Sequence, residues 1–120
     1  MSFENEWARC SHWIAAALEH ARGAYALEDV LEIVRLGDAR FWAGRQAAMV
    51  TEIHEYPRVR ALHFWLAGGD LAELRDHLRP MAEAWGRAQG CTRATIIGRK
   101  GWARALGYQE VATVCAKELS

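Results

Sequence analysis

The sequence predicts an α/β (α+β) fold: a mixed central sheet with two N-terminal helices, a long crossover helix and a short C-terminal helix. Three observations lead to this class. Two amphipathic stretches open the chain, strand-like runs flank Pro57, and residues 63–98 form a strand, a double glycine, a long amphipathic helix and a second strand. The last pattern is that of a βαβ unit, whose two strands are parallel. The length of 120 residues fits a single domain, residues 1–120.

Composition limits the partners and the location of the chain. Basic and acidic residues balance at fifteen each, so no nucleic-acid or membrane partner is expected. No apolar run reaches the ~20 residues that span a bilayer, and the N-terminus lacks an export signal, which predicts a cytoplasmic protein. The three cysteines lack CxxC spacing and have apolar neighbours, so we expect reduced, buried thiols at Cys10, Cys91 and Cys115.

The two opening helices are predicted from apolar residues that recur every three or four positions. The first helix should run from about residue 5 to residue 22, with Ser11 able to cap it a second time and Gly23 ending it. The second should run from 27 to 36, because acidic residues in its first turn suit the helix dipole and Gly37 suits its end.

Three strands are expected next, at 41–43, 47–55 and 59–67. A four-residue loop at 56–59 would fix the pairing of the last two as an antiparallel hairpin. Its apolar face would pair Glu55 with Arg60, Ile53 with Leu62, Thr51 with Phe64, and Met49 with Leu66. Its other face would pair Val50 with Trp65, Glu52 with His63, and His54 with Ala61.

The long helix should run from Asp70, a good N-cap, to about residue 88. Pro80 lies in its middle and removes the hydrogen bond to the Asp76 carbonyl, which predicts a kink near Arg79. Gly90 should end the helix. A parallel strand at 92–97, a short helix at 100–106 and a last strand at 108–117 complete the order.

This order resembles the GNAT (Gcn5-related N-acetyltransferase) fold over most of the chain. The residues that carry the resemblance are "LAGGDLAEL" before the long helix, Gly90-Cys91 after it, and "GWARALGY". The resemblance implies an acyl-CoA-dependent N-acyltransferase of unknown substrate, with acetyl-CoA as cofactor and a small-molecule or protein amine as acceptor. The chain also resembles compact relatives from bacterial tailed phages and prophages.

The resemblance places the CoA pyrophosphate at the glycine junction. In the family this loop reads Arg or Gln, two residues, Gly, one residue, and Gly or Ala, and its amides bind the anion at the helix N-terminus. The matching cofactor-binding positions are Leu66, Ala67, Gly68, Gly69, Asp70 and Leu71, with Arg99 and Arg104 in reach of a CoA phosphate. The loop is degenerate, because the Arg or Gln is missing and Asp70 is negative. A plain N-cap at Asp70, and a solvated helix end for the two arginines, are the alternatives.

Catalytic residues are expected on the polar face of the hairpin. The family's general acid is a tyrosine four residues before the Gly-aromatic pair, and that position is Ala103 here, while Tyr108 corresponds to the aromatic residue that is normally in the core. Glu52, His54 and His63 remain, since a carboxylate or an imidazole takes a proton from an ammonium substrate. Glu52 opposite His63 would raise the proton affinity of the histidine and orient its ring. A structural cross-strand pair is the alternative.

A second function class stays open. The chain would then be a non-catalytic GNAT-fold module that binds protein, in a phage or prophage setting. This alternative predicts a homodimer or a protein partner at an exposed apolar patch drawn from Trp7, Trp13, Trp42 and Trp102. No metal site is expected, because the five histidines and three cysteines show no compact ligand spacing.

Overall fold

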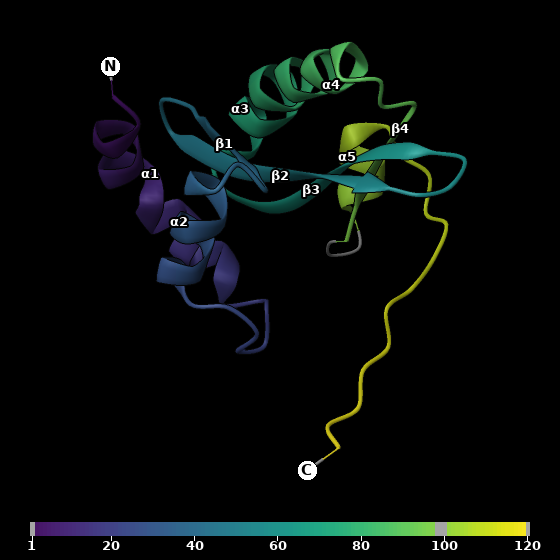
Figure 1. Cartoon of the computed structure of the whole chain (residues 1–120), viewed down its shortest axis with the longest axis horizontal. Helices are drawn as coiled ribbons and strands as arrows, with labels where there is room; N and C mark the ends of the chain where they lie inside the picture. The colour runs from purple at the N-terminus through teal and green to yellow at the C-terminus, as the bar shows by residue number, and fades with distance from the viewer. Residues whose placement is uncertain (1, 98–100, 120) are drawn as a thin grey trace.

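The structure is a computed structural model that describes residues 2–97 and 101–119, so the expected role of Arg99 lies outside the described residues. A four-stranded sheet in the order β1-β2-β3-β4 has helices on both faces (Figure 1). Its first two pairings are antiparallel and the β3–β4 pairing is parallel. The mixed α+β class is thereby confirmed. The elements are α1 Phe3–Leu18, α2 Leu27–Arg35, β1 Arg40–Ala43, β2 Ala47–Glu55, β3 Arg60–Gly69, α3 Leu71–Glu73, a π-helical turn η1 Leu74–Leu78, α4 Arg79–Ala88, β4 Arg93–Ile96 and α5 Trp102–Leu106.

Helices α1 and α2 cover one face of the sheet. The Ser2 side chain accepts a hydrogen bond from the Asn5 amide and starts α1. The helix continues past Ser11 and ends at Leu18, four residues earlier than expected. Its buried side chains pack with α2 on the sheet in one cluster, whose buried members are Trp7, Cys10, Ile14, Val30, Ala39, Ala48, Val50 and Leu66.

The crossover helix covers the opposite face and accommodates Pro80 by widening the turn before it. In η1 the Arg79 amide bonds to the Leu74 carbonyl, five residues back. Proline has no N–H for the next carbonyl in that pattern, which belongs to Arg75. The Arg79 Nε donates to this carbonyl at 3.2 Å instead. Where a kink near Arg79 was expected, the structure has a π-helical turn in which a side chain replaces the missing backbone donor.

The hairpin register is as expected from its loop as far as Thr51 and Phe64, and then it shifts. Val50 pairs with Leu66 and Met49 with Ala67, so the expected pairs Met49–Leu66 and Val50–Trp65 are wrong. Trp65 is the extra, unpaired residue of a β-bulge. A one-residue shift exchanges the faces of a strand, and Leu66 accordingly packs on the α1 side of the sheet.

The expected last strand is wrong for the single chain. Residues 108–119 form no strand and run away from the body of the molecule (Figure 1). Cys115 is exposed rather than buried, whereas Cys10 and Cys91 are buried as expected. A strand needs a neighbouring edge for its amides and carbonyls, and the described part of the chain places none beside the segment. Its β-branched residues alone therefore do not make it a strand.

Candidate functional site

Three adjacent strands bring the predicted catalytic residues onto one face of the sheet. Glu52 of β2 lies opposite His63 of β3, which lies beside Thr95 of β4. His54 Nε2 lies 3.4 Å from Glu52 Oε1. The rings of His54 and His63 stack with their centroids 4.7 Å apart. Glu52, His54 and His63 thus form one cluster, as the hairpin pairing predicts, with Thr95 as an additional member.

His63 is the buried member of this cluster, with 8% of its surface exposed. Burial lowers its pKa below the usual value, and the neighbouring His54 lowers it further, while Glu52 acts in the opposite direction. The expected rise in proton affinity is therefore outweighed. Thr95, rather than Glu52, orients the ring, since Thr95 Oγ1 lies 2.9 Å from His63 Nδ1. The imidazole is uncharged at neutral pH and able to accept a proton.

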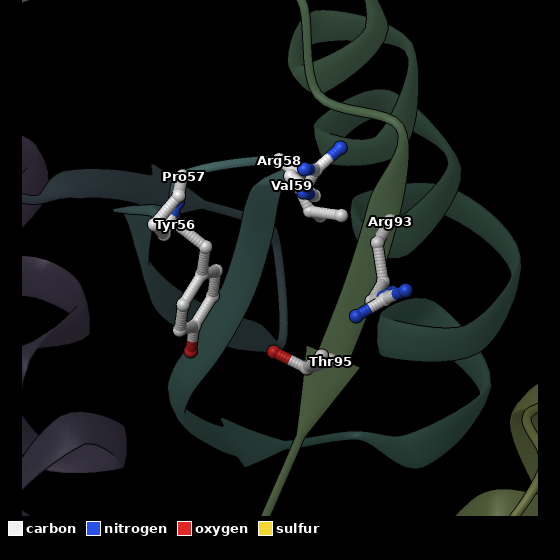
Figure 2. Close-up of a pocket in the computed structure, with 6 residues that line it drawn as sticks. All are labelled: Tyr56, Pro57, Arg58, Val59, Arg93 and Thr95. Carbon is white, nitrogen blue, oxygen red and sulfur yellow. The ribbon is translucent and has the colours of Figure 1, made fainter.

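A pocket opens beside the cluster, between the β2–β3 loop and β4 (Figure 2). It has a volume of about 490 Å³, which is within the range of small-molecule sites. Figure 2 shows the Tyr56 and Thr95 hydroxyls directed toward each other across it, with Arg58 and Arg93 on the opposite side from Tyr56. Thr95 also bonds to His63, so a ligand in the pocket would lie beside the histidine cluster.

The lining of this pocket combines apolar surface with two arginines and two hydroxyl groups. Its residues are Tyr56, Pro57, Arg58, Val59, Arg93 and Thr95. Among the described residues, neither arginine forms an ion pair. Sequence reasoning missed all six residues. The alternation of β3 and β4 could have indicated Thr95 only if their register had been known, and no short turn sets the register of parallel strands.

The glycine junction lies at the other end of β3. Asp70 accepts a hydrogen bond from the Glu73 amide at 3.1 Å, as the N-cap prediction requires. A Cβ on Gly68 would collide with the Trp13 carbonyl of α1, and one on Gly69 with the Gln46 carbonyl. The two glycines therefore allow close packing of protein on protein.

A second carboxylate lies at the start of the crossover helix. Glu73 accepts hydrogen bonds from the Arg45 amide at 2.9 Å and the Gln46 amide at 2.8 Å. These bonds lower the pKa of Glu73, so it is ionised at neutral pH. With Asp70 it places two negative charges where the resemblance locates a pyrophosphate, and one helix amide is already bonded to Asp70.

The other cofactor-binding candidates are spread over several environments. Leu66 is buried against α1, Ala67 packs on the α4 side, Leu71 is 47% exposed and Arg104 is exposed on α5. Beyond the last β3–β4 pair, a cavity of about 10 Å³ lies between the two strands, η1 and α5. It has room for about one water molecule. Trp102 and Leu106 of α5 line it, so α5 closes this gap.

Tyr108 has a structural environment. Its hydroxyl donates to Glu83 Oε2 at 2.6 Å, and Glu83 also pairs with Arg79 at 3.0 Å. Burial, with the Glu83 carboxylate second, raises the pKa of Tyr108 far above its usual value. This phenol attaches the end of α5 to α4, in line with the core role expected for the Gly-aromatic position.

Comparison with known proteins identifies the fold. A probable acetyltransferase superposes with a TM-score of 0.67 at 10% identity, over 100% of this chain and 94% of its own. A protein from Thermus thermophilus superposes with a TM-score of 0.66 at 12% identity, over 99% of this chain and 94% of its own. An aminoglycoside N-acetyltransferase in complex with CoA superposes with a TM-score of 0.58 at 16% identity, over 77% of this chain and 74% of its own. The fold is that of the GNAT-type acetyltransferases. No protein-family model and no curated protein matches the sequence.

The features expected of a binding module differ from the observed surface. Trp7 and Trp42 are buried, Trp13 and Trp102 are partly buried, and none of the six tryptophans is exposed. A partner-binding surface made of tryptophans therefore stays a prediction, and no exposed tryptophan supports it. Within residues 2–97 and 101–119, no helix is long and apolar enough to cross a membrane. No group of three potential metal ligands occurs in that part of the chain either.

Proposed function

We propose that the chain is an acyl-CoA-dependent N-acyltransferase in which His63 accepts the proton of the acceptor amine. One observation carries this proposal: a buried, uncharged imidazole in the middle of β3 is hydrogen-bonded to Thr95, which lines an open pocket. The fold of the solved acetyltransferases supports it. A cytoplasmic location and a phage or prophage setting stay predictions from the sequence.

The chemistry follows from the state of His63. The neutral ring takes the proton from the ammonium form of the acceptor, and the free amine then attacks the thioester carbonyl. The carbon–nitrogen bond forms and the carbon–sulfur bond breaks. The nitrogen loses its second proton to the departing sulfur, which leaves as the CoA thiol. His54, paired with Glu52, lies against the His63 ring and disfavours a lasting positive charge on it. That repulsion favours release of the proton after each cycle.

Acyl-CoA would lie along the second half of β3. Among the described residues this half has no partner on the β4 side, since the pairing ends at Phe64 and Ile96. A free strand edge pairs with an amide-bearing chain, and the pantetheine arm carries two amides. Asp70 is seven residues from His63, or about 23 Å along an extended strand. The arm would bridge that span, and α5 would have to move away from the 10 Å³ gap.

The acceptor would occupy the pocket at the opposite end of β3. Arg58 and Arg93 line it without acidic partners among the described residues. Guanidinium groups bind carboxylate and phosphate in a bidentate manner. We therefore expect an amine acceptor that also carries an acidic group, held with its nitrogen toward Thr95 and His63.

Calorimetry with acetyl-CoA, followed by thiol release with a panel of amino acids and other acidic amines, tests the proposal. We expect saturable binding and acceptor-dependent CoA release that rises as pH passes upward through the lowered pKa of His63 and then levels. H63Q should reduce kcat while acetyl-CoA binding persists; H77Q, an exposed histidine on η1, is the matched control. No heat and no thermal shift at millimolar acetyl-CoA would overturn the enzyme proposal in favour of the binding module.

A further inference from the structure

The segment after α5 has the composition of a strand but no partner strand among the described residues. Residues 109–117 include three β-branched residues, Val111, Thr113 and Val114, and such residues favour strands. Val111 is 83% exposed, Val114 67% and Leu119 86%. A lone extended segment gains nothing from its β-branched residues in water, because its backbone and its side chains stay hydrated. An exposed run of this kind indicates a missing contact.

The sheet offers a matching edge. β4 is the last strand in the order β1-β2-β3-β4, and among the described residues no strand pairs with its outer side. An unpaired edge presents a row of free amides and carbonyls, which is a ready site for one more strand. Ile97, directly after β4, is 67% exposed and extends the apolar character of this edge.

The start of the segment is fixed and directs it outward. The Tyr108 hydroxyl is bonded to Glu83 of α4, and Gly107 has a φ of +73° that turns the chain out of α5. From there the chain leaves the body of the molecule (Figure 1). Its nine residues 109–117 span about 30 Å when extended, enough to reach a second molecule.

We propose that residues 109–117 form a fifth strand on the β4 edge of a second copy of this chain, and that the second copy returns the same strand. Such reciprocal exchange is a closed two-fold arrangement: the same strand contact forms twice, once on the β4 edge of each copy. It also explains why a strand-like sequence is unpaired in the single chain.

The test compares the full chain with two variants by sedimentation in reducing buffer, which prevents disulfides through Cys115. V114P removes an amide and fits a paired strand poorly, and V111K adds a charge to one face. We expect a dimer for the parent and monomers for both variants. L36K is the matched control, because Leu36 is an exposed leucine, 69% accessible, at the end of α2. It should remain dimeric.

Amide hydrogen exchange distinguishes the occupants of the edge. In the dimer, amides within 109–117 should be protected, and V114P should remove the protection without altering the rest of the sheet. A monomeric parent with protected amides would mean that the segment folds back on its own β4, which overturns the proposal. A monomer with unprotected amides, or a dimer that both variants leave intact, overturns it as well.

Discussion

His63 links the fold to the proposed chemistry through its protonation state. Burial lowers its pKa, because a protonated ring would be a charge in a site that is largely closed to water. At a pH below 6.5, the usual pKa of histidine, the unfolded chain binds more protons than the folded chain. The contribution of His63 to stability is therefore complete above 6.5 and is lost as pH falls toward the lowered pKa.

We expect the free energy of unfolding to decrease as pH is lowered from 6.5 toward the folded pKa of His63. Urea denaturation at a series of pH values measures it. H63Q should flatten this dependence, whereas H77Q, which alters an exposed ring, should leave it in place. An unchanged slope in H63Q would show that another group causes the pH dependence.

Asp70 sets the charge at the start of the crossover helix. Asn caps a helix about as well as Asp, so D70N keeps the bond to the Glu73 amide and removes one negative charge. A charge at a helix terminus is worth about 0.3–1 kcal/mol, so if the pyrophosphate binds there, D70N should tighten acetyl-CoA binding by about two- to fivefold in calorimetry. E55Q, at the far end of the hairpin, should not change the affinity. Equal affinities for D70N and the parent would place the phosphates elsewhere.

At the scale of elements, α1 docks on β3 through Gly68. Because Gly68 has no side chain, the strand can approach the Trp13 carbonyl closely. This carbonyl belongs to the backbone of α1, so it cannot move aside as a flexible side chain can. We expect G68A to lower the free energy of unfolding by about 1–3 kcal/mol. G86A is the matched control: its Cβ would meet the Leu62 side chain at 3.1 Å, and alanine favours the helix. Urea denaturation should show a clearly larger loss for G68A; similar losses would contradict the tight contact.

The elements also show how far sequence reasoning reaches. The cluster of Glu52, His54 and His63 was predictable, because the loop after β2 sets the antiparallel register near it. The bulge at Trp65 was not, since residues 64–67 are all apolar and alternation there gives no sign of a shift. Thr95 depends on a parallel register that no turn fixes. The strand expected after Tyr108 is absent, because β-branched residues favour a strand but do not supply the neighbouring edge that it needs.

At the scale of the whole molecule, β3 organises the proposed reaction. The loop that leads into it borders, with β4, the pocket that contains Arg58 and Arg93. The middle of β3 carries His63, and its end carries the glycine junction. Two substrates would thus approach one strand from opposite ends. The proposed fifth strand would join the sheet beside β4, which carries Arg93 and Thr95. Dimer formation would therefore hold the acceptor pocket more rigidly while leaving its side-chain face open.

This arrangement ties the stability of the molecule to its concentration. If each copy completes the sheet of the other, association stabilises the folded state by mass action. The melting temperature of the parent should therefore rise when the protein concentration is raised about tenfold, as calorimetric scans at several concentrations can measure. V114P should melt at one temperature throughout, and L36K should follow the parent. A melting temperature of the parent that does not change with concentration would contradict the exchange of strands, because the segment would then contribute nothing to the stability of the sheet.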